Sequence, residues 1–560
     1  LLAEGTAAAP ILFTSSSATP SAGSWGGLRL RAASGSLASR FAYTTISYGG
    51  GWTNPGMVHV IGVAPELDHA TISNSSKHGM SLASGTGTIV SSSSFSANVQ
   101  SGIDASATGG SVTISGTSFI GNGQAISADA NTNFLDFTGL SFSGNGGGTG
   151  DGVLVRSGAI TGARTWFAGS VWELSGTVIV NAGFTLVVAP GTTVKLRPGS
   201  GLDVPGTLLA EGTAAAPILF TSSSASPVAG SWAGIRFRGA STLPTSRLSY
   251  ATVSYAGGPS SAAGGQSWAG SAQVSMGSPR FDHVSFSNCA TAGLQVAAGW
   301  TPVLSNMTFL GPSTCGLTVS GNIMLDAGMS YWGDATGPAG IGLGAGAPAQ
   351  GAVAYEPWLA SALNDVHRFE TVEVPNRTFS PPLEILHRVD FTVTSAGPWV
   401  VTYRSSTGAL VRTFSGEGIS GSATWDGRDE AGVLLAPGNY GYRVESSSAA
   451  GVSAAPLRGV AVLASAAPPL AVSGLSLSEP YFSPNGDSAK DSTRYSGSFN
   501  YGGVAWTVVV RVGEEPPLRT LSGVGATFAA VWAGLDQAGV VAPDGSYTLA
   551  LSATIGTTTI

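Results

Sequence analysis

Oxygen-bearing side chains gather in the segment FSPNGDSAKDS, which runs from Phe482 to Ser492. Asn485, Asp487 and Asp491 surround a glycine and are spaced two and four residues apart, like the ligands of a calcium-binding loop. The segment lacks the bidentate glutamate and the flanking helices of an EF-hand, and an Asx-rich turn uses the same residue types. The sequence therefore predicts either a Ca²⁺ site or a tight turn here, and it indicates no other cofactor.

Arginines alternate with apolar residues in two similar segments, GLRLRA from Gly27 and GIRFRG from Gly234. Because alternate side chains of a strand point to opposite faces, the apolar residues would enter a core and the arginines would line an outer face. Such basic strips could bind an acidic polysaccharide, whereas a solvated face or stacking on nearby tyrosines would leave them without a ligand. The two candidate strips consist of Arg29, Arg31 and Arg40, and of Arg236, Arg238 and Arg247.

Two Asp-His pairs are candidates for acid–base chemistry. Asp68-His69 and Asp282-His283 occupy equivalent positions in two similar parts of the sequence. An aspartate can orient a histidine as a general base, but neighbouring residues of a strand point to opposite faces, and no third partner is identifiable. We therefore expect two polar pairs on the surface.

Cleavage of a polysaccharide needs converging carboxylates, or carboxylates together with a cation and a basic residue. Asp104 and Asp129 follow similar strands and could stack on one another, yet no Lys or Arg lies in that stretch. The sequence thus assigns no catalytic residue, and we expect the chain not to be an enzyme.

The elements that must position these residues form a repeat. The stretch LLAEGTAAAPILFTSSSA at Leu1 recurs letter for letter at Leu208, and residues 1–50 align with 208–257 without a gap. A shorter period of about 23 residues lies inside each copy, with an apolar residue followed two or three positions later by an asparagine. These asparagines are Asn74, Asn98, Asn122, Asn145 and Asn288.

This period predicts an all-β, right-handed parallel β-helix in two homologous modules. Short alternating apolar runs between Gly, Asn and Ser indicate three strands per coil, and one coil cannot bury its apolar face alone. Stacking coils about 4.8 Å apart pairs every strand with its neighbours and builds a continuous core. We expect the recurrent asparagines to form a hydrogen-bonded ladder between coils.

The two cysteines, Cys289 and Cys315, would lie about one coil apart. Such a spacing permits a disulfide that clips neighbouring coils in an oxidising compartment, and it equally permits two buried thiols. Both alternatives stay open at the level of the sequence.

A different pattern follows the β-helix. Residues 399–440 align with 506–547, and short alternating strands separated by Asp-Gly and Pro-Gly turns predict two Ig-like β-sandwiches. The expected domains are β-helix modules at 1–165 and 166–364, followed by sandwiches at 365–466 and 467–560.

Composition narrows the classes of partner. Charged residues make up 10% of the chain, its formal net charge is −7, and Lys and Arg together number only 24. A nucleic-acid-binding surface would need basic clusters, and a membrane-spanning helix would need a run of about 18 apolar residues. We therefore expect neither a nucleic-acid partner nor a membrane span.

Several motifs resemble those of known families. GFTLVVAPGTTVKLRPGSGLDVPGTLLAEGTAAAPILFTS from Gly183 and SYWGDATGP from Ser330 resemble secreted bacterial β-helix proteins of the pectin-lyase-like superfamily, over about residues 1–360. The motif W-x-G-x-D-x-x-G at Trp425 and Trp532 resembles the Ig-like domain of flagellar hook-capping proteins. These resemblances imply a secreted bacterial surface protein, whose fold is shared by lyases, hydrolases and adhesins.

The sequence therefore favours a non-enzymatic extracellular or cell-surface protein, structural or adhesive, that presents a rigid β-helical stalk and possible contacts with polysaccharide. One alternative is a carbohydrate-active β-helix enzyme. A second is a subunit of an end-to-end filament, because an open β-helix end exposes strand edges and core to a second copy.

Overall fold

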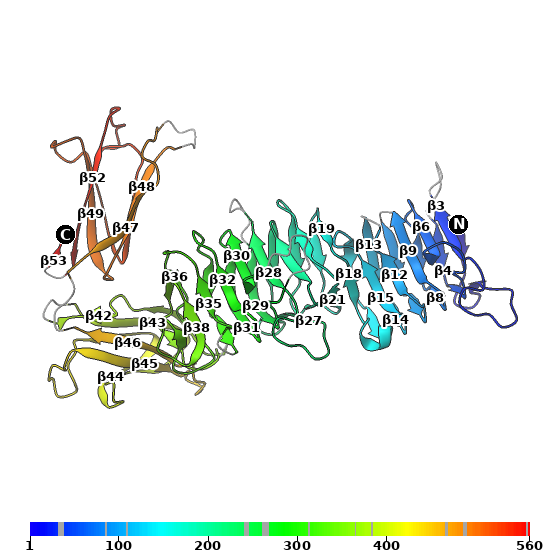
Figure 1. Ribbon diagram of the computed structural model, residues 1–560, viewed down its shortest axis with the longest axis horizontal. Helices are drawn as coiled ribbons and strands as arrows, with labels where there is room; N and C mark the ends of the chain where they lie inside the picture. Colours follow the sequence, from blue (N-terminus) through cyan, green and yellow to red (C-terminus); the bar gives the residue numbers. More distant parts are fainter. Residues whose placement is uncertain are drawn as a thin grey trace. The chain divides into compact units, whose positions relative to one another are not determined.

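The chain forms two compact units, Leu1–Tyr355 and Glu356–Ile560, in a computed structural model (Figure 1). The structure describes all residues except 32–38, 85–86, 108–109, 240–245, 260–267, 312–313, 364–365, 382–384, 465–468, 485–489 and 556–557. The division precedes the boundary expected after residue 364, because β40 (Trp358–Leu359) already pairs with β46 (Leu457–Leu463) in the second unit.

In the first unit, strands of successive coils pair in parallel, so each sheet is a stack of equivalent strands (Figure 1). The first sheet contains β1 (Leu2–Glu4), β4 (Arg40–Ala42), β7 (Glu66–Asp68), β10 (Thr88–Ser91), β13 (Ser111–Ser115) and β16 (Asn133–Asp136). The second contains β2 (Ile11–Phe13), β5 (Thr44–Ser47), β8 (Thr71–Ser73), β11 (Ser94–Ser96), β14 (Ser118–Ile120) and β17 (Ser141–Ser143). The register places Phe95 beside Ile72 and Phe119, which confirms the period of about 23 residues.

The third sheet of the first module continues past the junction between the modules. From its first strand, the path of this sheet runs through β3 (Leu28–Arg31), β6 (Gly56–Ile61), β9 (His78–Ser84), β12 (Ser101–Ala105), β15 (Gln124–Ala128), β18 (Val153–Val155), β21 (Val171–Leu174), β24 (Thr193–Leu196) and β27 (Ile218–Ser222), and it continues beyond β27. By sequence, β27 corresponds to β2 of the second sheet, so the two modules join with one face of the coil exchanged for another. The exchange follows β17 and the one-turn 3₁₀ helix η1 (Asn145–Gly148).

The counterpart of β3 in the second module lies in a sheet that begins after this junction. That sheet contains β19 (Gly158–Ile160), β22 (Val178–Val180), β25 (Gly201–Val204), β28 (Gly234–Arg238), β30 (Gly270–Met276), β32 (Ala292–Val296), β35 (Leu317–Val319), β38 (Gly346–Gln350) and β37 (Pro338–Gly340). The remaining strands of the unit are β20 (Arg164–Trp166), β23 (Thr185–Val188), β26 (Thr207–Glu211), β29 (Arg247–Ser254), β31 (Arg280–Ser287), β33 (Val303–Ser305), β34 (Thr308–Leu310), β36 (Leu325–Asp326) and β39 (Val353–Ala354).

Left-handed residues turn the chain between the first and second sheets and again after the second. In one coil these are Tyr43 (φ 44°) and Tyr48 (φ 62°), and in the next they are His69 (φ 51°) and Asn74 (φ 58°). Residues other than glycine adopt this conformation rarely, so the stacked neighbours must hold each bend in place. Later coils of this module place glycine at both bends, beginning with Gly116 and Gly121.

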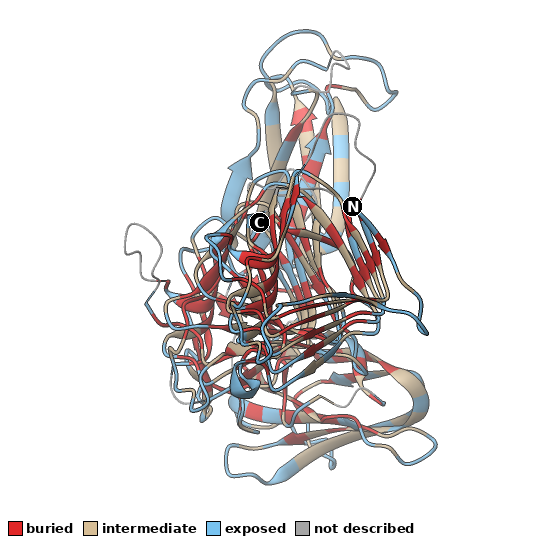
Figure 2. Cartoon of the chain, turned by 90° about the vertical axis from the view of Figure 1, so that its right-hand side faces the viewer, coloured by how far each residue is buried: buried red, intermediate tan, exposed pale blue. Residues whose placement is uncertain are grey.

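Aromatic side chains stack in columns inside the coils, and these rings are buried. Figure 2 shows buried residues recurring on the stacked strands. Phe119 stacks on Phe95 with ring centroids 5.4 Å apart. In the second module Phe309 stacks on Trp332 at 4.8 Å, so Trp332 of the SYWGDATGP motif occupies the slot that Phe309 occupies in the preceding coil.

A buried asparagine ladder runs along the first module. Asn98 Nδ2 donates to Asn122 Oδ1 at 2.8 Å, Asn122 Nδ2 donates to Asn145 Oδ1 at 2.8 Å, and Asn145 Nδ2 ends the ladder on Asp151 Oδ1 at 2.6 Å. The expectation that Asn74 shares this ladder is wrong, because its left-handed backbone puts it at the bend one position earlier. Asn288 (φ 52°) also lies at a bend.

Replacing the middle of this ladder should destabilise the β-helix. We expect Asn122→Ala to reduce the free energy of unfolding by about 2 kcal/mol or more, because the buried amide groups of Asn98 and Asn145 lose their hydrogen bonds to Asn122. Asn74→Gly is the matched control, since glycine adopts the left-handed bend without strain, and it should change the free energy by less than about 1 kcal/mol. Thermal or denaturant unfolding measures both, and equal stability of the two variants would contradict a stabilising ladder.

The strands of the second unit pair antiparallel, apart from β42 with β46, which is consistent with the two expected Ig-like sandwiches. The first sandwich contains β40, β46, β45 (Gly438–Ser446), β43 (His387–Arg404), β41 (Phe369–Glu373), β42 (Thr378–Phe379) and β44 (Leu410–Trp425). The second contains one sheet of β47 (Val472–Leu477), β48 (Thr493–Phe499) and β51 (Thr527–Trp532), and another of β50 (Arg519–Gly525), β49 (Val504–Arg511), β52 (Thr548–Ile555) and β53 (Thr558–Thr559).

The W-x-G-x-D-x-x-G motif closes the same loop in both sandwiches. In the first, Trp425 Nε1 donates to the carbonyl of Arg428 at 2.8 Å, and Asp429 Oδ1 accepts the backbone N–H groups of Ala431 and Val433. Trp532 and Asp536 make the corresponding bonds in the second sandwich. The motif that both sandwiches share therefore stabilises a loop, and these contacts assign it no binding or catalytic role.

Candidate functional site

The outer face of the third sheet carries a cluster of ionisable side chains formed by His78, Asp104 and Arg156. His78 lies in β9, Asp104 in the neighbouring strand β12, and Arg156 directly after β18. His78 Nε2 is 3.5 Å from Asp104 Oδ2, and Arg156 Nη2 is 3.7 Å from Asp104 Oδ1. Sequence reasoning missed this cluster, although the spacing of His78 and Asp104 by about one coil is a signal that could have found it.

Hydrogen bonds fix the proton on His78. The backbone N–H of Ser101 donates to His78 Nδ1 at 3.0 Å, so Nδ1 holds the lone pair and Nε2 carries the hydrogen that faces Asp104. Burial lowers the pKa of His78 in spite of the opposing carboxylate of Asp104, and the charge of Arg156 acts in the same direction as burial. His78 is therefore a neutral imidazole whose lone pair is already occupied.

Asp104 and Asp129 do not stack, contrary to the expectation from sequence. The register sets Asp104 opposite Ser127, and Asp129 lies in the turn after β15, where its carboxylate accepts the N–H of Asn131 at 2.6 Å. A basic residue does lie beside Asp104, although the sequence did not indicate it. This residue is Arg156, which belongs to a later coil.

Two arginines of the candidate strip in the second module, Arg236 and Arg238, share one buried carboxylate. Asp203 in β25 is 3% exposed, and its Oδ1 accepts hydrogen bonds from Nε of Arg236 at 3.1 Å and from Nε of Arg238 at 2.8 Å. Burial alone would raise the pKa of Asp203, but the hydrogen bonds and charges of the two arginines outweigh it and lower the pKa. Arg236 also lies over the ring of Trp268, 5.0 Å from its centroid.

Arg40 and Arg247 of the candidate strips pair with carboxylates on adjacent coils. Arg40 forms ion pairs with Glu4 and Glu66, each at 3.5 Å, and Arg247 pairs with Glu211 at 3.4 Å. Arg29 and Arg31 are exposed on β3, and Arg29 is aligned with His59 of β6. Burial lowers the pKa of His59, and the charges of both arginines add to this effect.

The two Asp-His pairs differ from the expected geometry. Because His283 has φ 54°, its ring turns back beside Asp282 instead of pointing to the opposite face, and His283 Nδ1 lies 2.9 Å from Asp282 Oδ1. A third partner exists as well, since the ring of Tyr250 stacks on His283 at 4.2 Å. The pair Asp68-His69 repeats this arrangement with Tyr43, at a ring distance of 4.6 Å.

The predicted calcium loop lies largely outside the described residues. Asn485 and Asp487 belong to the range 485–489, and Asp491 lies just before β48. No group of three or more potential metal-binding side chains occurs among the residues that the structure describes.

A disulfide joins Cys289 to Cys315, with Cα atoms 5.0 Å apart. Both half-cystines are buried, and the bond connects two consecutive coils of the second module. Such bonds persist in oxidising compartments.

Comparison with known proteins supports the fold. Residues 23–164 match the family model of a right-handed β-helix region, and residues 158–267 match that of a pectate-lyase-like β-helix domain. Together with the parallel sheets, these matches define the first unit as a right-handed parallel β-helix. No curated protein is significantly similar in sequence.

Two solved structures share limited likeness with the chain. Dimeric latent PorU from Porphyromonas gingivalis is 10% identical, with a TM-score of 0.15, and the match covers 37% of this chain and 21% of that one. A structure described as giving insight into host cell surface retention of a 1.5-MDa bacterial ice-binding adhesin is 10% identical, with a TM-score of 0.13, covering 33% and 63% respectively. The chain thus spans less than two thirds of either protein, and these scores support no statement about its activity.

Removal of the carboxylate of Asp203 should destabilise the second module. Asp203→Asn removes the buried carboxylate that Arg236 and Arg238 share, and we expect a loss of about 3 kcal/mol at neutral pH. Because the folded pKa of Asp203 is depressed, its contribution is present above the unfolded value of about 3.9 and disappears as pH falls through the folded pKa. The control Glu211→Gln, at an exposed pair, should cost less than about 1 kcal/mol. Urea unfolding of both variants at pH 7 and pH 3 tests this.

His78 should make the β-helix less stable in weak acid. Its folded pKa lies below the unfolded value of about 6.5, so stability is full above that pH and declines as pH falls toward the folded pKa, where only the unfolded chain takes up the proton. We expect His78→Gln to reduce the difference in melting temperature between pH 7.5 and pH 5. An unchanged difference would show that His78 titrates alike in the folded and unfolded states.

Proposed function

We propose that the chain is a non-enzymatic protein of the cell exterior, structural or adhesive, whose β-helix presents a long rigid surface. The observation that carries this proposal is the bonding of the His78 cluster. Its side chains resemble an acid–base site, but they already interact with other groups of the β-helix. The lone pair of His78 accepts a backbone N–H, its own hydrogen faces Asp104, and Asp104 accepts a further bond from the hydroxyl of Ser106 at 2.7 Å. A general base needs a free lone pair within reach of substrate.

Two further features support the proposal. The disulfide between Cys289 and Cys315 suits an oxidising compartment, as a secreted or surface protein would encounter. The ladders of hydrogen bonds and stacked rings tie each coil to the next, which suits a rigid spacer. Among the described residues, no helix is long and apolar enough to cross a membrane.

A panel of glycans tests the absence of catalysis. Polygalacturonate, alginate and neutral oligosaccharides are incubated with the protein, and new reducing ends and unsaturated products are measured. We expect no product from the wild type or from Asp104→Asn. Turnover by the wild type that disappears in Asp104→Asn would overturn the proposal in favour of a carbohydrate-active enzyme.

A further inference from the structure

The outer face of one sheet in the first sandwich is hollowed into a cleft of about 450 Å³. The cleft lies over β41, β43 and β44, and the side chains that line it combine hydroxyl groups, charged groups and the aromatic rings of Phe391 and Trp399. Pockets of about 300–1,000 Å³ with a few convergent polar groups and apolar walls are typical of small-ligand sites. The volume and lining of this cleft therefore fit a ligand of the size of a short saccharide.

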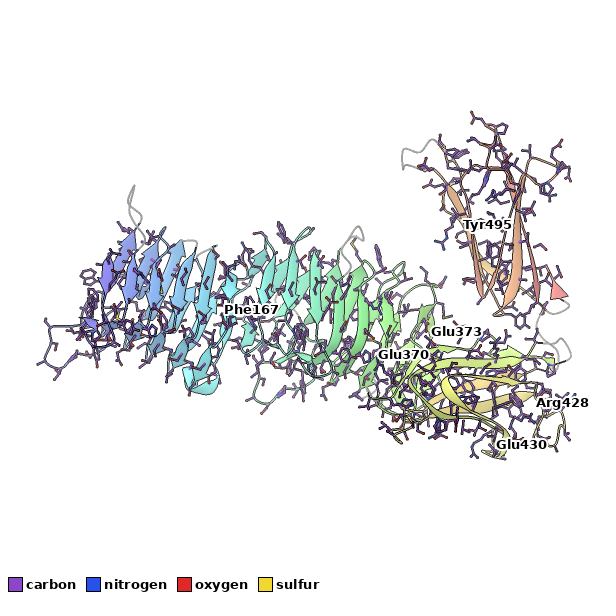
Figure 3. The ribbon with its side chains drawn as sticks, turned by 180° about the vertical axis from the view of Figure 1, so that it is seen from behind. Phe167, Glu370, Glu373, Arg428, Glu430 and Tyr495 are labelled. Atoms are coloured by element: carbon purple, nitrogen blue, oxygen red, sulfur yellow. A yellow bond between two sulfur atoms is a disulfide. The ribbon has the colours of Figure 1, made fainter. Side chains whose placement is uncertain are left out.

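Two carboxylates face each other across strands in this cleft. Glu373 of β41 is directly opposite Asp390 of β43, and Figure 3 labels Glu373 on its strand. Arg388 balances one of them, because its Nε donates to Asp390 Oδ1 at 2.9 Å. The three side chains together carry one excess negative charge, and like charges directly opposite each other destabilise a sheet.

The second sandwich shows that the fold does not need these carboxylates. Its strands β47 and β48 take the places of β41 and β43, since Thr493 is aligned with Trp532 just as His387 is aligned with Trp425. At the register of Glu373 and Asp390 it has Ser476 and Ser496, whose hydroxyl oxygens are hydrogen-bonded at 3.0 Å. The same position thus holds two hydrogen-bonded hydroxyl groups in one copy and two carboxylates in the other, one of them paired with Arg388.

The wall of the cleft supplies apolar surface and further hydrogen-bonding groups. Trp399 packs edge to face on Phe391, with centroids 5.5 Å apart, and its buried Nε1 has no acceptor among the described residues. Opposite Phe391 stands Gly421, where a Cβ would lie 2.2 Å from the Phe391 ring. Thr371 and Thr392 add two hydroxyl groups, hydrogen-bonded to each other at 2.7 Å.

We propose that this cleft binds a neutral glycan, an inference that rests on the proposed adhesive function and names a ligand class for it. The carboxylates of Glu373 and Asp390 accept hydrogen bonds from sugar hydroxyls, Arg388 donates to ring or hydroxyl oxygens, and the partly exposed ring of Trp399 contacts the C–H face of a pyranose ring. The excess negative charge repels uronate and sulfate groups, so the ligand differs in charge from the acidic polysaccharide considered for the arginine strips.

Binding of the full chain to cellohexaose, mannohexaose, maltohexaose and polygalacturonate, measured by calorimetry, tests the proposal. We expect at least one neutral hexasaccharide to bind, polygalacturonate to fail to compete for it, and the double variant Glu373→Gln, Asp390→Asn to weaken binding by about tenfold or more. Ser476→Ala, at the matched position of the second sandwich, should leave binding unchanged. The double variant should melt no lower than the wild type, since it removes the repulsion between the strands.

The outcomes separate this inference from the proposed function. Binding of a neutral glycan that the double variant retains in full would overturn the cleft while leaving an adhesive protein in place. Failure of all three neutral probes to bind would also overturn it. Cleavage of any probe by the wild type would instead overturn the non-enzymatic function, whatever the effect of Glu373 and Asp390.

Discussion

The coil-to-coil register is the constraint on which the β-helix depends. Parallel strands stack about 4.8 Å apart, so each side chain has the equivalent residue of the next coil as its neighbour on either side. A buried polar group is therefore tolerated where it can bond to a copy of itself, as Asn98 and Asn122 do. Aromatic rings obey the same rule by stacking in columns, as Phe95 and Phe119 do.

The same constraint governs the charges on the outer faces. Equal charges on successive coils repel each other at short range, and at several positions the structure places opposite charges next to each other instead. Arg40 lies between Glu4 and Glu66, and two arginines share the buried carboxylate of Asp203. Ionisable side chains that look available in the sequence are thereby used for the attachment of one coil to the next.

The cleft of the first sandwich differs, because two carboxylates lie opposite each other on neighbouring strands. Glu373 and Asp390 oppose each other across a strand pair, while the related sandwich solves the same contact with two serines. The first sandwich thus places two carboxylates, one of them paired with Arg388, where the second has hydrogen-bonded serines, and this difference singles out the cleft as the candidate ligand surface. The β-helix would then act as a stalk, and recognition would fall to the sandwich.

The sequence by itself determined the repeating architecture. A period of about 23 residues, two homologous modules and the slot of Trp332 could all be predicted, because stacking forces equivalent residues to recur at equal spacing. The asparagine ladder was predictable in kind but not in membership, since a left-handed bend at Asn74 shifts it by one position.

The tertiary structure alone decided which charged groups meet. His78, Asp104 and Arg156 come from different coils, and the left-handed backbone of His283 reverses the direction that strand alternation would give it. The exchange of faces at the junction between the modules likewise depends on the irregular turns around η1, whose path no periodic pattern encodes. Periodicity fixes what stacks on what within a module, whereas turns and bends break the period and so must be seen in three dimensions.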